Sequence, residues 1–225
     1  VVLDRPNPIK TGVVEGPILD LEYKSFVGLH SIPVRHGKTI GQLARQFQSE
    51  CFPKTQLYVL EMEGYKDDLW FDQTGLPWII PSPNMPTLDT AIVYPGMCLF
   101  EATNVSEGRG TTKPFEFFGA PFIDAEELCR YLNGLHLPGV YFRENYFQPT
   151  FHKGANQING GAQIHVLDRD VFDSFNMAIE ILKFLFHRYP NDFTWKQPPY
   201  EYEYEKLPID ILLGSGTFRK EFIEK

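Results

Sequence analysis

The chain has 225 residues, which suits one large domain or two modest ones, and its 43% hydrophobic and 22% charged residues are ordinary for a globular fold. Its 21 basic and 29 acidic residues give a net charge of −8, with no run of three basic residues, which argues against a nucleic-acid-binding surface. Any anionic ligand must therefore be met by a local group of cations. No apolar stretch approaches the roughly 20 residues of a membrane-spanning helix.

The N-terminal segment is predicted to start inside a domain. Residues 1–3 are typical of the end of a strand, and residues 4–8 form a polar, proline-containing loop after it. A domain seldom begins at such a point, so we expect an upstream half of the same protein to be missing. A Thr-x-x-Gln capping box at residues 39–42 predicts a helix, and the apolar run 57–62 predicts a strand covered on both faces.

Three prolines within residues 81–86 indicate a junction, because such a segment cannot join a central strand. After it, Asp124 is predicted to open a helix with a buried stripe at Ala125, Leu128, Cys129 and Leu132. Another helix is predicted from near Asp170 to the residue before Pro190. Strands are predicted at 98–102, 140–143 and 162–167.

This order predicts a mixed α/β and α+β fold with two domains, at residues 1–88 and 89–225.

Cysteine and glycine motifs exclude several kinds of site. The three cysteines, Cys51, Cys98 and Cys129, form no CxxC pair, and no HExxH motif occurs, so we expect no metal site. Residues 108–111 lack the spacing and the lysine of a phosphate-binding loop, and we expect no cofactor.

Polar residues next to glycines or prolines form the candidate functional loops, because sites are commonly built from loops at the ends of elements. They lie at residues 4–8 with 15–16, at 35–37 and at 104–112, with a more dispersed group at Arg143, His152, Lys153 and His165. Structural roles remain open for each loop: Asp4 suits an Asx turn, and Glu107 to Arg109 suit a tight turn.

The Arg35-His36-Gly37 triplet admits a rival interpretation, since histidine phosphatases begin with an Arg-His-Gly motif. In that family the motif follows the first strand and a second histidine comes late in the chain. Neither His165 nor His187 has suitable neighbours here. A histidine-phosphatase-like phosphohydrolase is therefore kept as a second alternative.

Eight motifs in one order resemble the NamZ-type exo-β-N-acetylmuramidases, a family of bacterial peptidoglycan hydrolases. The motifs are LDRPNP at 3–8, VEGP at 14–17, SFVG at 25–28, IPVRHG at 32–37, TGLPW at 74–78, PSPNMP at 81–86, EATNVSEGRGTT at 101–112 and FHK at 151–153.

The resemblance implies a Rossmann-like N-terminal domain, of which residues 1–88 would be the later part, followed by a smaller α+β domain. It implies release of N-acetylmuramic acid from the non-reducing end of cell-wall glycan fragments, by a secreted or periplasmic glycosidase. The catalytic acid usual in the family would lie in the upstream half. The partner implied is a muropeptide or a MurNAc-GlcNAc glycan, with no nucleic acid and no membrane span in this chain.

Glycoside hydrolysis needs a proton donor and a second group at the anomeric carbon, unless the substrate's acetamido group supplies the second. Glu107 and Glu15 are the candidate catalytic carboxylates. A bidentate arginine suits the lactyl carboxylate of muramic acid, with Arg35 as first choice and Arg109 as second. The candidate substrate-binding residues are Asp4, Arg5, Asn7, Arg35, His36, Asn84, Asn104 and Arg109.

Two other classes of function stay open. The chain could be a cell-wall glycan-binding module without catalysis, or an inactive fragment of a larger enzyme. Binding of muropeptides without release of sugar would favour the module, and no binding at all would favour the fragment.

Overall fold

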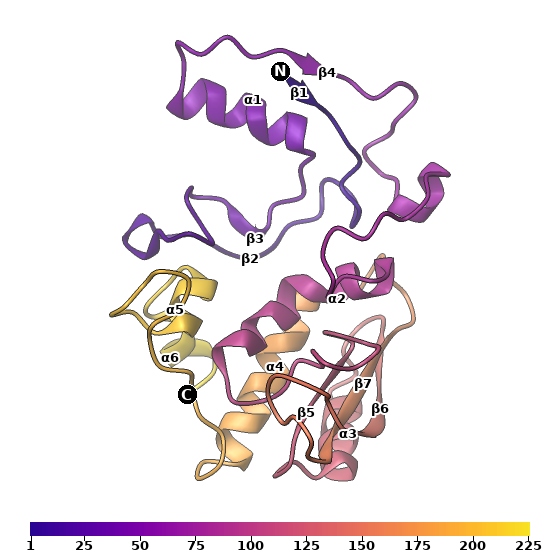
Figure 1. Ribbon diagram of the computed structural model, residues 1–225, viewed down its shortest axis with the longest axis vertical. Coiled ribbons are helices and arrows are strands. Elements are labelled where there is room, and N and C mark those ends of the chain that lie inside the picture. Colours follow the sequence, from indigo (N-terminus) through magenta and orange to yellow (C-terminus); the bar gives the residue numbers. More distant parts are fainter.

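The computed structural model describes residues 1–225 and shows two parts, one above the other in Figure 1. Residues 1–87 form the upper part and the remainder forms the lower part, so the predicted mixed α/β architecture is confirmed. None of the helices combines the length and the apolar character needed to cross a bilayer.

The upper part contains two small sheets and one long helix. Strand β1 pairs with β4 in parallel, with α1 in the connection between them, and β2 pairs with β3 in antiparallel orientation. The elements are β1 (Val2–Leu3), β2 (Glu15–Ile18), the 3-10 turn η1 (Leu21–Tyr23), β3 (Pro33–Arg35), α1 (Ile40–Cys51), β4 (Val59–Leu60) and the 3-10 turn η2 (Phe71–Thr74).

Helix α1 begins as its capping box predicts. The Thr39 hydroxyl accepts a hydrogen bond from the Gln42 amide at 3.2 Å, and the Gln42 side chain accepts one from the Thr39 amide at 3.0 Å. Asp4, at the end of β1, accepts from the Gly41 amide at 2.8 Å. A Cβ at Gly41 would lie 2.6 Å from the Asp4 carboxyl, so glycine is what lets the helix approach β1 this closely.

The lower part is built on a three-stranded antiparallel sheet of order β5-β7-β6. Helices α2, α3 and α4 pack around it, and α5 and α6 follow near the C-terminus (Figure 1). The elements are α2 (Leu88–Met97), the 3-10 helix η3 (Cys98–Ala102), β5 (Phe117–Ala120), α3 (Ala125–Gly134), β6 (Val140–Phe147), β7 (Asn159–Val166), α4 (Ser174–Arg188), α5 (Pro208–Leu213) and α6 (Phe218–Phe222).

The hydrophobic core is one cluster of 32 buried residues, all at position 70 or later in the chain. Helix α4 contributes Ile181, Leu182 and Leu185, each with no exposed side-chain surface. The apolar stripe predicted for α3 is buried as expected. Helix α4 starts at Ser174 rather than near Asp170, because Asp173 is its N-cap and accepts from the Asn176 amide at 2.8 Å.

Several strand predictions need correction. Residues 98–102 form η3, which continues directly from α2 and buries Leu99 and Phe100. In the run 57–62, only Val59 and Leu60 pair with a strand, and Leu60 is 58% exposed, so this strand is not covered on both faces. The residue pattern also failed to indicate α2 and β5. The predicted strands 140–143 and 162–167 correspond to β6 and β7.

Contacts join the two parts at two ends and between them, where Glu15 accepts a hydrogen bond from the Phe175 amide at 3.1 Å. At one end, Asp170 accepts hydrogen bonds from Lys10 at 2.8 Å and from the Trp70 indole at 3.0 Å. At the other end, the ring of Phe26 meets the ring of Tyr202 edge-on at 5.5 Å, and Lys206 donates to the Glu22 carbonyl. The two parts therefore enclose space between these ends.

Candidate active-site cleft

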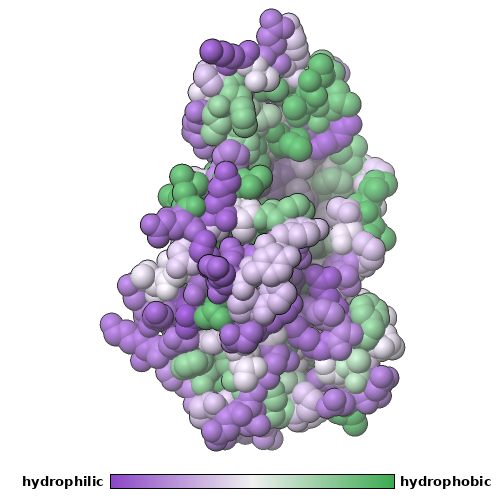
Figure 2. All heavy atoms as spheres, turned by 60° about the vertical axis from the view of Figure 1, so that its left-hand side comes forward, coloured by the Kyte–Doolittle hydropathy of each residue, from purple (hydrophilic) through white to green (hydrophobic).

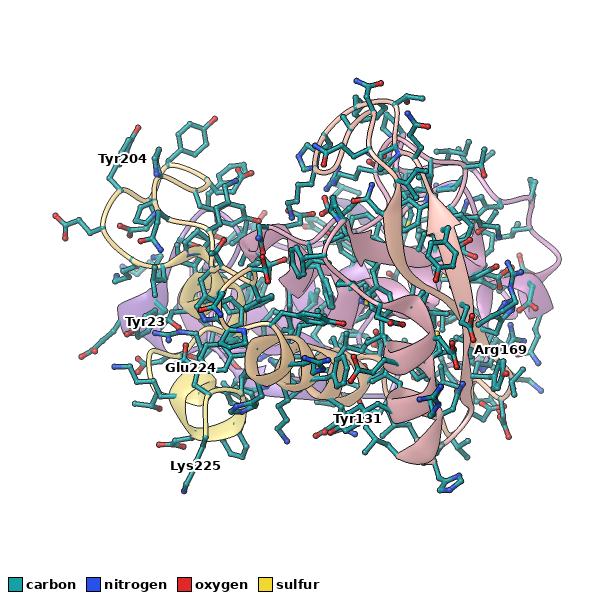
Figure 3. The ribbon with its side chains drawn as sticks, turned by 90° about the horizontal axis from the view of Figure 1, so that it is seen from below. Tyr23, Tyr131, Arg169, Tyr204, Glu224 and Lys225 are labelled. Carbon is teal, nitrogen blue, oxygen red and sulfur yellow. The ribbon has the colours of Figure 1, made fainter.

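A cleft of about 1270 Å³ lies between the upper and lower parts. Figure 2 shows the molecule hollowed at this level, with both hydrophobic and hydrophilic residues around the hollow. Its walls come from the segment after β1, the loop between β2 and β3, the start of α1, helix α2 and the segment around Tyr200. A smaller cavity of about 650 Å³ lies near Tyr131 and Lys225 (Figure 3) and is lined by none of the motif residues. The larger cleft is therefore the candidate site.

Aromatic rings occur on both walls of the cleft. Phe26 and Phe47 come from the upper part, Trp78 from the segment before the prolines, and Tyr94 and Tyr200 from the lower part. Such rings offer flat apolar faces on which a sugar ring packs. Figure 3 shows that the loop following Tyr200 carries Tyr204 out from the body of the molecule.

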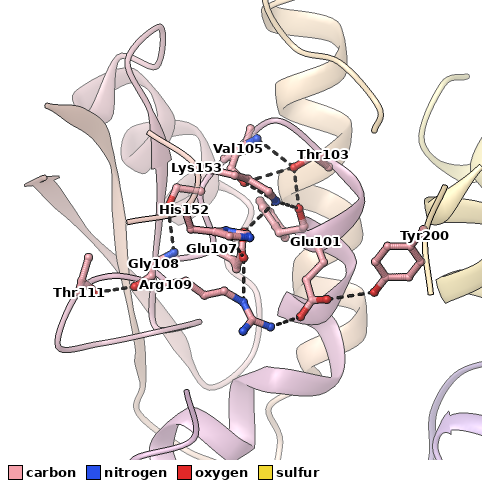
Figure 4. A network of polar contacts seen from close by, with 12 residues as sticks. Glu101, Thr103, Val105, Glu107, Gly108, Arg109, Thr111, His152, Lys153 and Tyr200 are labelled. Atoms are coloured by element: carbon pink, nitrogen blue, oxygen red, sulfur yellow. Dashed lines mark hydrogen bonds and ion pairs between the residues drawn. The ribbon is translucent and has the colours of Figure 1, made fainter. Parts of the chain in front are cut away.

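On the lower wall, polar side chains form a connected network (Figure 4). Glu101 accepts a hydrogen bond from Arg109 at 2.6 Å and from the Tyr200 hydroxyl at 3.0 Å. Burial raises the pKa of Tyr200, and the charge of Glu101 raises it further, so the phenol stays protonated as a donor. All three residues line the cleft.

Behind Arg109 lies Glu107, whose side chain has no exposed surface. Lys153 donates to its Oε2 at 2.8 Å, while Arg109 Nε and His152 Nδ1 lie 3.0 and 3.3 Å from its Oε1. Neither contact to Oε1 has hydrogen-bond geometry, so this buried oxygen accepts no hydrogen bond within the chain. Lys153 also donates to the carbonyls of Phe100 and Val105, at 2.7 and 3.2 Å, and thereby fixes η3 to the loop after it.

Lys153 is itself largely buried. Burial lowers the pKa of Lys153, and the neighbouring Glu107 carboxylate opposes that shift. The Lys153 ammonium donates to three acceptors, and the Glu107 carboxylate lies next to Lys153 and Arg109. Each of the two buried charges therefore needs the other for compensation. The pair positions Arg109 at the wall of the cleft.

On the upper wall, Arg35 forms a second buried ion pair. Its guanidinium donates to Glu15 and to the Ile9 carbonyl, and it lies over the Trp70 ring at 5.7 Å. Both side chains of the Arg35–Glu15 pair are only 3% exposed. Glu15 also accepts from the Phe175 amide at 3.1 Å, near the start of α4. Burial raises the pKa of Glu15, and the charge of Arg35 opposes the shift.

Comparison with known proteins identifies the family. The profile described as the C-terminal part of the exo-beta-N-acetylmuramidase NamZ matches residues 92–225, and the profile of its N-terminal part matches residues 1–89. The chain belongs to the NamZ family. The resemblance drawn from the ordered motifs is thereby confirmed.

One relative within the NamZ family has a named activity. The peptidoglycan beta-N-acetylmuramidase NamZ of Bacillus subtilis (strain 168) is 51% identical over 219 residues, which are 97% of this chain and 51% of the relative. The chain therefore spans about half the length of the curated relative it matches.

Two solved structures share the fold. Crystal structures of two DUF1343 family proteins from Bacteroides fragilis superpose with TM-scores of 0.85 and 0.63, at 31% and 29% identity. They cover 97% and 99% of this chain, which corresponds to 57% of each of those chains.

The predicted site residues form three groups according to their position relative to the cleft. Five of them line the cleft, from both of its walls: Arg5, Asn7, Arg35, His36 and Arg109. Asp4, Glu15 and Glu107 are buried behind the walls. Asn84 and Asn104 are not among the lining residues.

Several of these side chains have their polar atoms engaged in the fold. Asp4 accepts from the Thr39 hydroxyl at 2.9 Å in addition to the Gly41 amide. Asn7 donates to the Lys38 carbonyl at 3.0 Å, and Asn104 donates to the Asp192 carbonyl at 2.7 Å. These contacts give Asp4 and Asn104 structural roles, and substrate binding by either one stays a prediction.

The same holds for the two candidate catalytic carboxylates. Glu15 and Glu107 are held in buried ion pairs, and neither is among the residues that line the cleft. Catalysis by either one stays a prediction, whereas a structural role for both follows from the contacts.

Among the cleft residues that sequence reasoning missed are Glu101, Tyr200 and Lys38. Glu101 lay in a segment interpreted as a strand, and Tyr200 in a segment without a motif. The available signal was that Glu101 opens the motif at residues 101–112.

Proposed function

We propose that this chain acts in the hydrolytic release of N-acetylmuramic acid from the non-reducing ends of peptidoglycan fragments. The observation that carries the proposal is its 51% identity, over 97% of its length, to the Bacillus subtilis protein named for that activity. The cleft between the two parts would be the sugar site. Its volume of about 1270 Å³ exceeds that of ordinary small-molecule pockets, which leaves room for more than one sugar ring.

Within the cleft, Glu101 is the carboxylate best placed to meet a sugar. Its side chain is 19% exposed, and Arg109 and Tyr200 hold it at two atoms, so it is pre-oriented to accept hydrogen bonds from sugar hydroxyls. Arg5, Asn7 and His36 would face the sugar from the opposite wall. A 2-acetamido sugar can supply its own nucleophile, so hydrolysis would need one acid from the protein.

The proposal also covers the cellular location of the protein and the origin of its N-terminal part. Peptidoglycan lies outside the cytoplasmic membrane, so we place the protein in the periplasm or outside the cell. The parallel β1–β4 pair with α1 in its connection supports a Rossmann-like origin for residues 1–88.

The test uses the chain with the disaccharide MurNAc-β-1,4-GlcNAc. Binding is measured by calorimetry, and release of free N-acetylmuramic acid by liquid chromatography with mass spectrometry. We expect binding and release, with Glu101→Gln weakening both and the exposed Glu126→Gln on α3 changing neither.

The remaining outcomes discriminate between alternatives. Binding without release overturns hydrolysis by this chain on its own and supports a cell-wall glycan-binding module, whose evidence is the aromatic, cation-bearing cleft itself. Absence of both binding and release overturns the sugar site. The phosphohydrolase alternative gains no support, because the chain belongs to the NamZ family and Arg35 of the Arg-His-Gly triplet is buried against Glu15.

A further inference from the structure

The cleft is rich in cations although the protein is acidic. Four residues with fixed positive charge line it, Arg5, Arg35, Lys38 and Arg109, against the two carboxylates Glu101 and Glu201. The chain as a whole carries a net charge of −8. An excess of positive charge confined to a cleft of an acidic protein marks a place for an anionic group.

Two of these cations are already neutralised by the fold. Arg35 is paired with buried Glu15, and Arg109 is paired with Glu101 at 2.6 Å and Glu107 at 3.0 Å. Drawing either guanidinium to a ligand would leave a carboxylate without its counter-charge in a largely buried place, which is costly. Arg35 and Arg109 therefore make poor receptors for a ligand carboxylate.

The other two cations have no counter-charge. Neither Arg5 nor Lys38 takes part in an ion pair, and the Lys38 ammonium makes no hydrogen bond within the chain. The Arg5 guanidinium donates only to the carbonyl of Asp4, at 2.7 Å, so most of its donors are free.

Both cations lie on segments that run side by side. Asn7 donates to the Lys38 carbonyl at 3.0 Å, and the Thr39 hydroxyl donates to Asp4 at 2.9 Å, which ties residues 4–7 to residues 38–39. At the start of α1, Asp4 and the Thr39 hydroxyl already accept from the Gly41 and Gln42 amides. The attraction for an anion comes from the two side chains.

We propose that Lys38, together with Arg5, binds the lactyl carboxylate that distinguishes N-acetylmuramic acid from N-acetylglucosamine. The assignment rests on the proposed function, and it replaces Arg35 as the residue that selects the muramic sugar. His36 lines the same stretch of the cleft, so the carboxylate would meet Lys38 and Arg5 beside a residue able to contact the rest of the sugar. A charge-assisted hydrogen bond of this kind changes affinity roughly 10- to 150-fold.

The experiment compares two free sugars on the chain. Dissociation constants for N-acetylmuramic acid and N-acetylglucosamine are measured by NMR titration for the unmodified chain, Lys38→Met, Lys38→Arg and the matched control Lys54→Met, an exposed lysine outside the cleft. We expect Lys38→Met to raise the dissociation constant of N-acetylmuramic acid by roughly 10-fold or more. The dissociation constant of N-acetylglucosamine should stay within about twofold of its value for the unmodified chain. Lys38→Arg should keep most of the selectivity, and Arg5→Met should lose a smaller part of it.

Each remaining result has a defined meaning. If the unmodified chain binds both sugars and Lys38→Met alters both equally or neither, the carboxylate subsite is overturned while the sugar site stands. If the unmodified chain binds neither sugar, the proposed function fails and the subsite fails with it. Because Lys38 has no partner within the chain, its variants should unfold at the temperature of the unmodified chain, and circular dichroism checks this.

Discussion

Residues 70–225 hold all 32 side chains of the hydrophobic cluster, whereas residues 1–69 contribute none. In that first stretch the buried residues are mainly polar: Asp4, Asn7, Thr11, Glu15, Arg35 and Thr39. Large apolar side chains such as Leu3 and Leu60 are more than half exposed there. The lower part is thus stabilised by apolar burial, and the upper part by directional polar contacts that also set the upper wall of the cleft.

The largest expected effect comes from the buried Arg35–Glu15 ion pair of the upper part, whose Glu15 also accepts a hydrogen bond from the Phe175 amide in the lower part. Glu15→Gln leaves the buried Arg35 guanidinium without its counter-charge and should lower the free energy of unfolding by about 3–5 kcal/mol, as measured by urea denaturation. The matched control is Glu61→Gln, in the exposed pair with Arg45, with a loss of no more than about 1 kcal/mol. Equal losses in both variants would contradict a polar basis for the upper part.

The hydrophobic core of the lower part supplies the next effect. Leu182→Ala removes a side chain with no exposed surface from α4 and should cost about 2–5 kcal/mol of unfolding free energy. The same change at Leu60, which is 58% exposed in β4, should cost no more than about 0.5 kcal/mol. A large loss at Leu60 would show that apolar burial matters in the upper part as well.

The loss of unfolding free energy should be smaller at Asp4, whose side chain links the end of β1 to the start of α1. Asp4→Ala removes the acceptor for the Gly41 amide and the Thr39 hydroxyl and should cost about 1–2 kcal/mol. Asp68→Ala, an exposed aspartate of the same part, is the control and should change stability by no more than about 0.5 kcal/mol. Indistinguishable unfolding curves for the two variants would remove Asp4 from the polar framework.

The reactivity of the three thiols tests the same difference between the upper and lower parts without a substitution that alters stability. Cys51 of the upper part is exposed, whereas burial raises the pKa of Cys129 in α3 to about 12 and that of Cys98 to about 12. At pH 8, a chromogenic disulfide reagent should therefore modify one thiol quickly in the folded chain and all three in urea. Rapid reaction of two or three thiols without denaturant would mean that the lower part opens readily.

The smallest effect concerns pH. Burial lowers the pKa of His36 below its ordinary value of 6.5, with a further contribution from the charge of Lys38. The unfolded chain then binds the proton more tightly, so stability is lost as the pH falls from about 6.5 through the lower folded-state value. His36→Gln should flatten this part of the pH profile of the unfolding free energy, and an unchanged slope would contradict the assignment.

What could be predicted from the sequence depended on how local the cause was. The caps at Thr39 and Asp124 and the apolar stripe of α3 were predicted, because each involves residues within a few positions of one another. The run 98–102 was misassigned, since a short apolar run does not show by itself whether it forms a strand or a buried helical turn.

The site was predicted less well for the same reason. The family and the loops that carry its motifs could be predicted, but not which charges are compensated. Arg35 meets Glu15 across 20 positions, and Lys153 meets Glu107 across 46. Lys38 is recognisable as a free cation only after those pairs are known.

Glu15 has one more consequence, which concerns how the cleft is held. It pairs with Arg35 within the upper part and accepts a hydrogen bond from the amide of Phe175 in the lower part, deep inside the protein. The two parts also meet through the Asp20 amide and the Gly214 carbonyl, 2.9 Å apart, and through Lys206 and the Glu22 carbonyl. Separating the parts at Glu15 would leave a buried carboxylate short of a donor, which is costly. Glu15 should therefore fix the spacing between the two walls, so that the cleft is already formed before a glycan arrives.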